Sequence, residues 1–290
     1  MKNWIVIIGL IVCPLFSWGQ NFVYPSLPDS ISGRQDRINY MVDHFWTENT
    51  IADTAYFQSP RLLLDYLYLL GQTDEQDRYV KSFVSLACKQ EQTFGQILYW
   101  LDRILYDSSS PHYNENLYSS LMNAVLVSDV DSVMKLIPRQ RMEMMNKNQV
   151  GKQANDFSFV TKEGKTKSLY KIEAPFLLLV FNNPDCSLCH QTENSIVQNG
   201  LLQLLLNRGK LKLLAITPNA DYEEWLNHPY PSNWLVGYDK EKVIYEQRLY
   251  DIQRLPCLYL LDKDKRVLLK EADYDHLWKY LSENGSLLER

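Results

Sequence analysis

The stretch F-L-L-L-V-F-N-N-P-D-C-S-L-C-H, residues 176–190, organises the C-terminal half of the chain. It opens with an unbroken apolar run, residues 176–181, which ends at Asn-Asn-Pro-Asp. A run of this length bounded by turn residues predicts a strand buried on both faces. Residues 191–207 then carry apolar side chains at helical spacing. The two cysteines, Cys186 and Cys189, are therefore expected where a buried strand turns into a helix.

Cys186 is predicted to be the attacking thiol of this pair. A thiol at the N-terminus of a helix faces unpaired backbone N–H groups and the positive end of the helix dipole. Both favour the thiolate, which is the nucleophilic form of cysteine. Cys189 lies one helical turn further on and is expected to be more buried. It is therefore predicted to be the resolving thiol that closes a mixed disulfide intramolecularly.

This order of strand, C-x-x-C and helix resembles the active site of the thioredoxin family. About seventy residues after the motif, residues 254–262 are R-L-P-C-L-Y-L-L-D. Thioredoxin-like proteins have a cis-proline before a buried strand at this place, beside the cysteines, and Pro256 matches it. The resemblance thus implies a cis Leu255–Pro256 bond, although cis is otherwise the minority isomer. It also implies a substrate groove formed at these two residues.

The resemblance covers residues 151–290 and implies an α/β thioredoxin-like fold, a central mixed sheet with helices on both faces. A predicted hairpin before the first parallel strand is similar to the TlpA-like subgroup of the family. The activity implied is that of a thiol-disulfide oxidoreductase with a redox-active disulfide at Cys186 and Cys189. Its implied partners are cysteine-containing exported proteins and an upstream redox donor.

Three residues depart from the family pattern. Val180 occupies the position, six residues before the first cysteine, where thioredoxins carry a buried carboxylate that accepts a proton from the resolving thiol. Asp185 replaces the common tryptophan and is expected to disfavour the Cys186 thiolate. Cys257 follows Pro256 as a third thiol, either near the pair or pointing into the core of its strand. Asp185, His190 and Cys257 are thus possible modulators of the site, His190 as a cation near the thiolate or as a solvated residue.

Two other hypotheses for the C-x-x-C stretch stay open. Residues 186–190, C-S-L-C-H, match the attachment motif of c-type haem, although a buried strand before the motif does not fit a small helical cytochrome. The domain could also be a non-catalytic binding module with a static disulfide. A zinc site is not predicted, because the five histidines are scattered and there is no second cysteine pair. The sequence predicts no cofactor and no metal.

The N-terminal half is predicted to be an all-helical domain, residues 34–147, of about six helices. Its segment D-R-I-N-Y-M-V-D-H-F-W, residues 36–46, resembles a helical domain of unknown function that precedes thioredoxin-like domains in envelope proteins. This resemblance implies no activity. Cys88 is expected to be a buried, inert thiol. The polar residues 146–155 are predicted to form a linker to the thioredoxin-like domain, residues 151–290.

The first residues have the pattern of a signal peptide, residues 1–19. Lys2 precedes an apolar stretch, residues 4–16, and small residues follow at 17–19, so cleavage is expected near residue 19. The chain is therefore predicted to be exported to the periplasm or cell envelope, with no transmembrane helix in the mature chain. A net charge of −5 and the absence of a basic stripe argue against nucleic acid as a partner.

Overall fold

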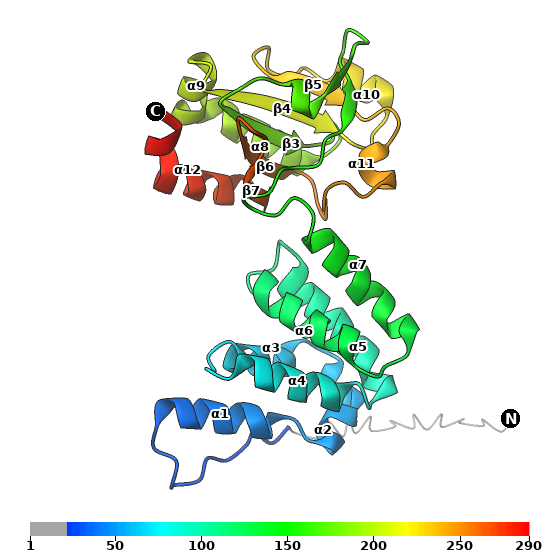
Figure 1. The fold of residues 1–290 in the computed structure, drawn as a ribbon, viewed down its shortest axis with the longest axis vertical. Helices are drawn as coiled ribbons and strands as arrows, with labels where there is room; N and C mark the ends of the chain where they lie inside the picture. Colours follow the sequence, from blue (N-terminus) through cyan, green and yellow to red (C-terminus); the bar gives the residue numbers. More distant parts are fainter. Residues whose placement is uncertain (1–21, 290) are drawn as a thin grey trace, which may run out of the picture. The chain divides into compact units, whose positions relative to one another are not determined.

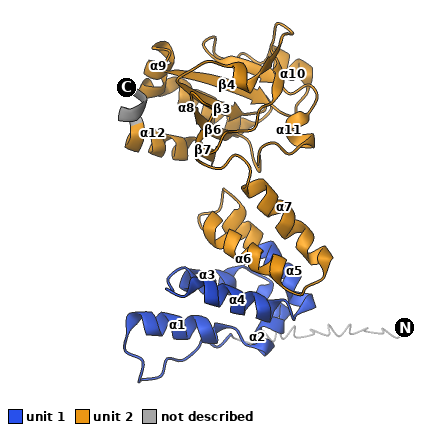
Figure 2. Ribbon diagram, viewed as in Figure 1, with its two compact units in different colours: residues 1–100 blue, residues 101–290 orange. Residues whose placement is uncertain are grey.

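The computed structural model describes the backbone of residues 22–289 and side chains up to residue 284. The expected signal peptide, residues 1–19, lies outside this range. Contacts divide the chain into two compact units, which meet in the sequence between Trp100 and Leu101 (Figure 2). No helix within residues 22–289 has the length and apolar character needed to cross a membrane.

The first unit consists of short helices (Figure 1). Aromatic side chains pack in its core. Its elements are α1 (Arg34–Phe45), α2 (Glu48–Ala52), η1 (Thr54–Phe57), α3 (Arg61–Leu70), α4 (Gln76–Ala87) and α5 (Glu91–Leu101), whose last residue begins the second unit. Phe45, Trp46 and Tyr66 contact one another, with ring centroids 5.1 to 6.2 Å apart. Aromatic pairs in this range stabilise a core beyond their buried area. The prediction of an all-helical N-terminal region is confirmed.

The second unit begins with helices and continues into an α/β structure. The helical elements are the π-helix η2 (Asp102–Tyr106), α6 (Glu115–Val127), η3 (Ser132–Lys135) and α7 (Leu136–Met145). The elements that follow are β1 (Ser158–Val160), β2 (Thr166–Ser168), η4 (Leu169–Lys171), β3 (Phe176–Phe181), α8 (Ser187–Gln198), α9 (Gly200–Asn207), β4 (Leu211–Thr217), α10 (Tyr222–Asn227), β5 (Leu235–Tyr238), α11 (Val243–Glu246), β6 (Cys257–Asp262), β7 (Val267–Ala272) and α12 (Tyr274–Glu289).

The strands form one mixed sheet in the order β2-β1-β5-β4-β3-β6-β7. β3 is central: it pairs in parallel with β4 and antiparallel with β6. β4 pairs in parallel with β5, and hairpins close the two edges. The predicted thioredoxin-like fold with a mixed sheet is confirmed.

Side chains of β3 alternate between two separate cores. Leu177, Leu179 and Phe181 pack on one face, together with Ile244 of α11. Leu178 and Val180 pack on the other face, which α8, α9 and α12 cover (Figure 1). Because helices cover both faces, the strand is apolar at every position. The prediction that residues 176–181 form a strand buried on both sides is confirmed.

The predicted linker is held by hydrogen bonds to the sheet region. The amide of Asn148 donates to the Leu249 carbonyl at 2.8 Å, and the N–H of Gly151 donates to the Val267 carbonyl at 2.8 Å. The first contact thus joins the segment to the loop after α11, and the second joins it to the start of β7. The division by contacts also falls at Trp100 and Leu101, earlier than residues 147–151. That residues 34–147 and 151–290 are separate domains stays a prediction.

One predicted helix differs from the structure. Residues 191–207 are not one helix, because Asn199 caps a new one: its side-chain oxygen accepts the N–H of Leu202 at 3.0 Å at the start of α9. Residues 240–250 contain only the short helix α11. Lys242 and Arg248, on either side of it, have left-handed backbone angles that a continuous right-handed helix cannot include.

Candidate active site

Cys186 lies at the junction of β3 and α8, as the N-cap residue of α8. Its sulfur accepts the backbone N–H of Cys189 at 3.1 Å, and its own N–H donates to the Asn183 carbonyl at 3.0 Å. An N-cap acceptor satisfies one of the unpaired N–H groups at the start of a helix. The sulfur of Cys186 therefore takes the acceptor role that suits a thiolate, at the positive end of the helix dipole.

Cys189 lies beneath Cys186, one turn inside α8. Its side chain is 1% exposed, whereas Cys186 is half-buried. Burial raises the pKa of the Cys189 thiol well above its ordinary value, and the hydrogen bond with Cys186 raises it further. The two thiols therefore differ in the way the sequence predicts, with an accessible first cysteine and a buried second one.

Leu255 lies beside Cys186 at the end of the sheet, and Pro256 follows it in the chain. β6 begins directly after Pro256 and pairs with β3 so that Cys257 lies opposite Phe181, the last residue of β3. The Cys186 thiol donates to the Leu255 carbonyl at 3.7 Å. The Leu255–Pro256 peptide bond is cis, the isomer that the sequence analysis expected. The pairing of β3 with β6 thus brings the predicted groove residues to the cysteines.

Cys257 faces away from the pair. It packs in the same core as Phe181 and Tyr259, whereas Ile196 of α8 packs on the opposite face of the sheet. Its side chain is buried, and burial raises the pKa of this thiol well above its ordinary value. The thiol donates to the Asp251 carbonyl at 3.8 Å. Cys257 therefore lies on the face of the sheet opposite α8, in line with the alternative that it points into the core.

Asp185 and His190 are exposed residues beside the motif. The N–H of Asp185 donates to the Asn183 side-chain oxygen at 2.9 Å, which shapes the turn after β3. The ring of His190 donates from Nε2 to the Pro184 carbonyl. In this arrangement the imidazole of His190 supports the turn before Cys186, and its role as a cation near the thiolate stays a prediction.

A buried polar network lies behind the cysteines, and the sequence did not predict it. Glu193 follows Cys189 by one turn of α8, and its carboxylate accepts from the Asn182 amide at 3.1 Å. The other oxygen of Glu193 lies 3.1 Å from Nε2 of His228. These two side chains are only 13% and 9% exposed. The network continues from Asn182, whose oxygen accepts the Thr217 hydroxyl at 3.2 Å.

The negative charge of Glu193 acts on the Cys189 thiol. It raises the pKa of this thiol further, although burial and the hydrogen bond with Cys186 raise it more. A carboxylate is therefore present near the resolving thiol although Val180 replaces the family's usual one. The spacing of Cys189 and Glu193, four residues apart in a helix, places both on one face and was the available sequence signal.

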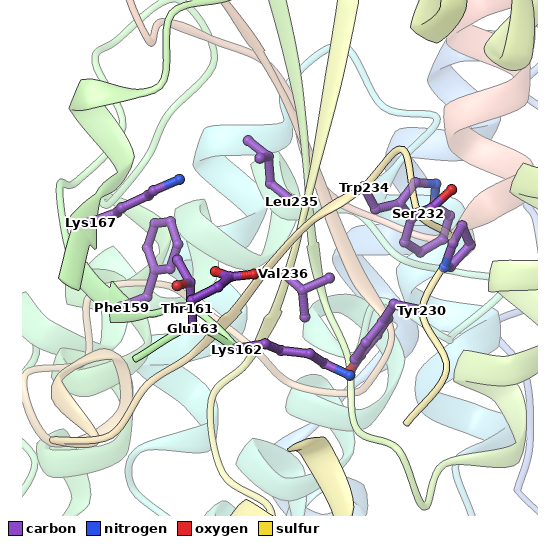
Figure 3. Close-up of a pocket in the computed structure, with 11 residues that line it drawn as sticks. Phe159, Thr161, Lys162, Glu163, Lys167, Tyr230, Ser232, Trp234, Leu235 and Val236 are labelled. Carbon is purple, nitrogen blue, oxygen red and sulfur yellow. The ribbon is translucent and has the colours of Figure 1, made fainter. Parts of the chain in front are cut away.

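A pocket of about 290 Å³ lies between the β1–β2 hairpin and the segment before β5 (Figure 3). Phe159, Lys162, Tyr230 and Trp234 are among its lining residues, and neither cysteine of the pair lines it. Lys162 donates to the carbonyls of Leu226 and His228 at 2.9 and 2.6 Å. The ammonium group thus holds the segment that carries His228. Tyr230 lines the pocket and also donates its hydroxyl to the Asn182 side-chain oxygen at 3.4 Å, so it belongs to the network behind Cys189 as well.

Comparisons with known proteins agree with both halves of this description. Residues 10–148 match the family described as Domain of unknown function (DUF5106). A crystal structure of a thioredoxin-like protein from Bacteroides caccae is 31% identical, with a TM-score of 0.74 over 91% of this chain and 99% of that chain.

Two further solved structures each match about half of the chain. The C-terminal domain of an uncharacterized protein from Bacteroides fragilis is 36% identical over 47% of this chain and 98% of that chain, with a TM-score of 0.45. A domain of a possible thiol-disulfide isomerase from Cytophaga hutchinsonii is 27% identical over 50% of this chain and 98% of that chain, with a TM-score of 0.41. No curated protein matches the sequence significantly.

Proposed function

The chain belongs to the family of thioredoxin-like proteins, and from this membership we propose that it is a thiol-disulfide oxidoreductase acting on exported proteins. The proposal rests mainly on the exposure and the contacts of the Cys186 thiol. The Cys186 sulfur is accessible, accepts a helix N–H at 3.1 Å and lies 3.7 Å from the Leu255 carbonyl, with Cys189 buried beneath it. A static structural disulfide does not require this difference in exposure.

In the first step the Cys186 thiolate attacks one sulfur of a substrate disulfide. The substrate S–S bond breaks, a Cys186–substrate disulfide forms, and the leaving thiolate takes a proton from solvent. An incoming peptide lies along the Leu255 carbonyl beside the sulfur. The first cysteine is suited to this step because a backbone N–H and the helix dipole stabilise its negative charge before attack.

In the second step Cys189 attacks the Cys186 sulfur of the mixed disulfide. This breaks the bond to the substrate, releases its second thiol and leaves a Cys186–Cys189 disulfide. Cys189 must first lose its proton, which burial disfavours. We assign the role of acceptor to Glu193, held by Asn182 and His228 one turn from the thiol. A dithiol donor protein then returns the pair to the reduced state.

Trapping of the mixed disulfide tests the proposal. Cys189→Ala is expected to accumulate covalent adducts with exported proteins, and Cys186→Ala is expected to form none, because only the first thiol of the C-x-x-C pair is accessible. Each variant would be expressed, quenched in acid, alkylated and examined for high-mass bands that a reductant removes. Cys257→Ala is the matched control, since its thiol is buried on the other face of the sheet.

Three outcomes would count against the proposal. Adducts that persist in Cys186→Ala and vanish in Cys257→Ala would show that the thiol after Pro256 attacks. No adducts in any variant, together with no reduction of insulin by the wild-type protein, would favour a binding module with a static disulfide. Absorbance in the Soret region of the purified protein would favour the haem hypothesis for the C-S-L-C-H stretch.

Export to the periplasm or cell envelope is part of the proposal. It is supported by the charged, apolar and small-residue pattern of residues 1–19. Structural disulfides form in such oxidising compartments, where a partner for the C-x-x-C pair is available.

A further inference from the structure

The segment after α5 contacts the loop that ends at the active-site proline. Tyr106, the last residue of the π-helix η2, donates its hydroxyl to the carboxylate of Asp251. Two residues later, the N–H of Ser108 donates to the Gln253 side-chain oxygen at 3.3 Å. In return, the Arg254 guanidinium donates to the Ser108 carbonyl at 3.2 Å. Three consecutive contacts therefore attach residues 251–254 to this segment.

The attached loop leads directly to the reactive sulfur. Residue 255 follows these contacts, and its carbonyl is 3.7 Å from the Cys186 sulfur. Within the loop, the Gln253 amide also donates to Asp251 at 3.2 Å. Ser108, Arg254 and Pro256 line the same narrow crevice. A shift of the loop would therefore move the groove residues at Cys186.

Tyr106 is itself held firmly by the helices around it. Its ring stacks on Tyr118 with centroids 5.0 Å apart, and the guanidinium of Arg141 lies 4.7 Å from the ring centroid. Arg141 in turn binds both carboxylate oxygens of Asp102, the first residue of η2, at 2.9 and 3.0 Å. Tyr106 and Asp251 are 3% and 6% exposed. A buried hydroxyl aimed at a buried carboxylate is a strong and directional contact. π-Helical turns inside longer helices occur frequently at functional sites.

We infer that Tyr106 and Ser108 are positioning residues for the active site, which set the place of the loop 251–255 and thereby the access of protein substrates to Cys186. This inference rests on the proposed function. It gives a role to part of the helical half, which carries no assigned activity. Because a protein substrate must lie along the loop, whereas a small disulfide need only reach the Cys186 sulfur, the effect should appear with protein disulfides and not with a small disulfide.

The test compares Tyr106→Phe with Tyr118→Phe in the full chain. Both substitutions remove one buried hydroxyl that binds a carboxylate, Asp251 for Tyr106 and Asp102 for Tyr118. Only Tyr106→Phe removes a contact with the loop 251–255. Tyr106→Phe is expected to raise the KM for insulin about tenfold with little change in kcat, which corresponds to about 1.4 kcal/mol. The rate of reaction of Cys186 with 5,5′-dithiobis(2-nitrobenzoic acid) is expected to stay the same.

Gln253→Ala is the second variant, because it removes the contact with Ser108 from the loop side and leaves the buried tyrosine intact. It should raise the KM for insulin in the same direction. Equal KM values for wild type, Tyr106→Phe and Gln253→Ala would overturn the inference, as would an equal rise in Tyr118→Phe. If wild-type protein does not reduce insulin through Cys186 at all, the proposed function fails first, and the two failures are thus distinguishable.

Discussion

Glutamine in place of Glu271 is expected to make the stability of the fold less dependent on pH. The Glu271 side chain on β7 is 8% exposed, and its carboxylate lies 3.5 Å from the ammonium group of Lys270. It accepts the hydroxyl of Tyr259 at 3.4 Å. Burial raises the pKa of Glu271 to about 7 from an ordinary 4.5, although the charge of Lys270 opposes this.

The sign of the pH dependence follows from which state of the chain, folded or unfolded, keeps the Glu271 proton at a given pH. Below about pH 4.5 the carboxyl is neutral in the folded and unfolded states, so it gives no pH dependence. Between 4.5 and about 7 the unfolded chain loses the proton while the folded chain keeps it. The free energy of unfolding therefore falls as pH rises through this window. The free energy of unfolding falls by about 1.4 kcal/mol for each pH unit in this window, so the total loss is about 3 kcal/mol.

Urea unfolding of wild type and Glu271→Gln at several pH values between 5 and 8 measures this effect. Glutamine keeps an oxygen for the Tyr259 hydroxyl, and Lys270 retains Glu115 at 2.8 Å, so packing and the second ion pair survive. The variant should gain stability relative to wild type as pH rises, by about 3 kcal/mol at pH 8 compared with pH 5. Glu173→Gln, at an exposed carboxyl, is the control. A difference between Glu271→Gln and wild type that is constant with pH would refute the reasoning.

Three further outcomes are expected. Glu193→Gln should slow release of the mixed disulfide on the order of a hundredfold, measured by acid quench, because a positioned base is lost; release at the wild-type rate would remove Glu193 from the mechanism. Leu179→Ala should lower the free energy of unfolding by about 2–5 kcal/mol in urea, while the exposed Leu188→Ala should change it little. Mass spectrometry of exported protein should find a new N-terminus near residue 19, and an intact Met1 would contradict the signal-peptide prediction.

Local sequence patterns determined the secondary structure around the cysteines and the helical character of the N-terminal half. The apolar run at 176–181 specifies a strand covered on both faces, and the turn residues after it place Cys186 at the start of a helix. A helix start always presents free N–H groups, so the different environments of Cys186 and Cys189 follow from their spacing alone. The helical character of the N-terminal half likewise follows from the period of its apolar residues.

Tertiary structure decided what depends on strand register and on contacts between distant residues. The face on which Cys257 lies is set by its pairing with Phe181, because a shift of one residue would turn the thiol to the other side of the sheet. The Glu193–His228 pair joins α8 to the residue that follows α10, 35 residues away in sequence, and the Tyr106–Asp251 contact joins residues 145 apart. The periodicity of apolar residues reports only on residues that are close in sequence. These contacts join residues that are far apart in sequence, so they are determined by how the sheet and the helices pack in the folded protein.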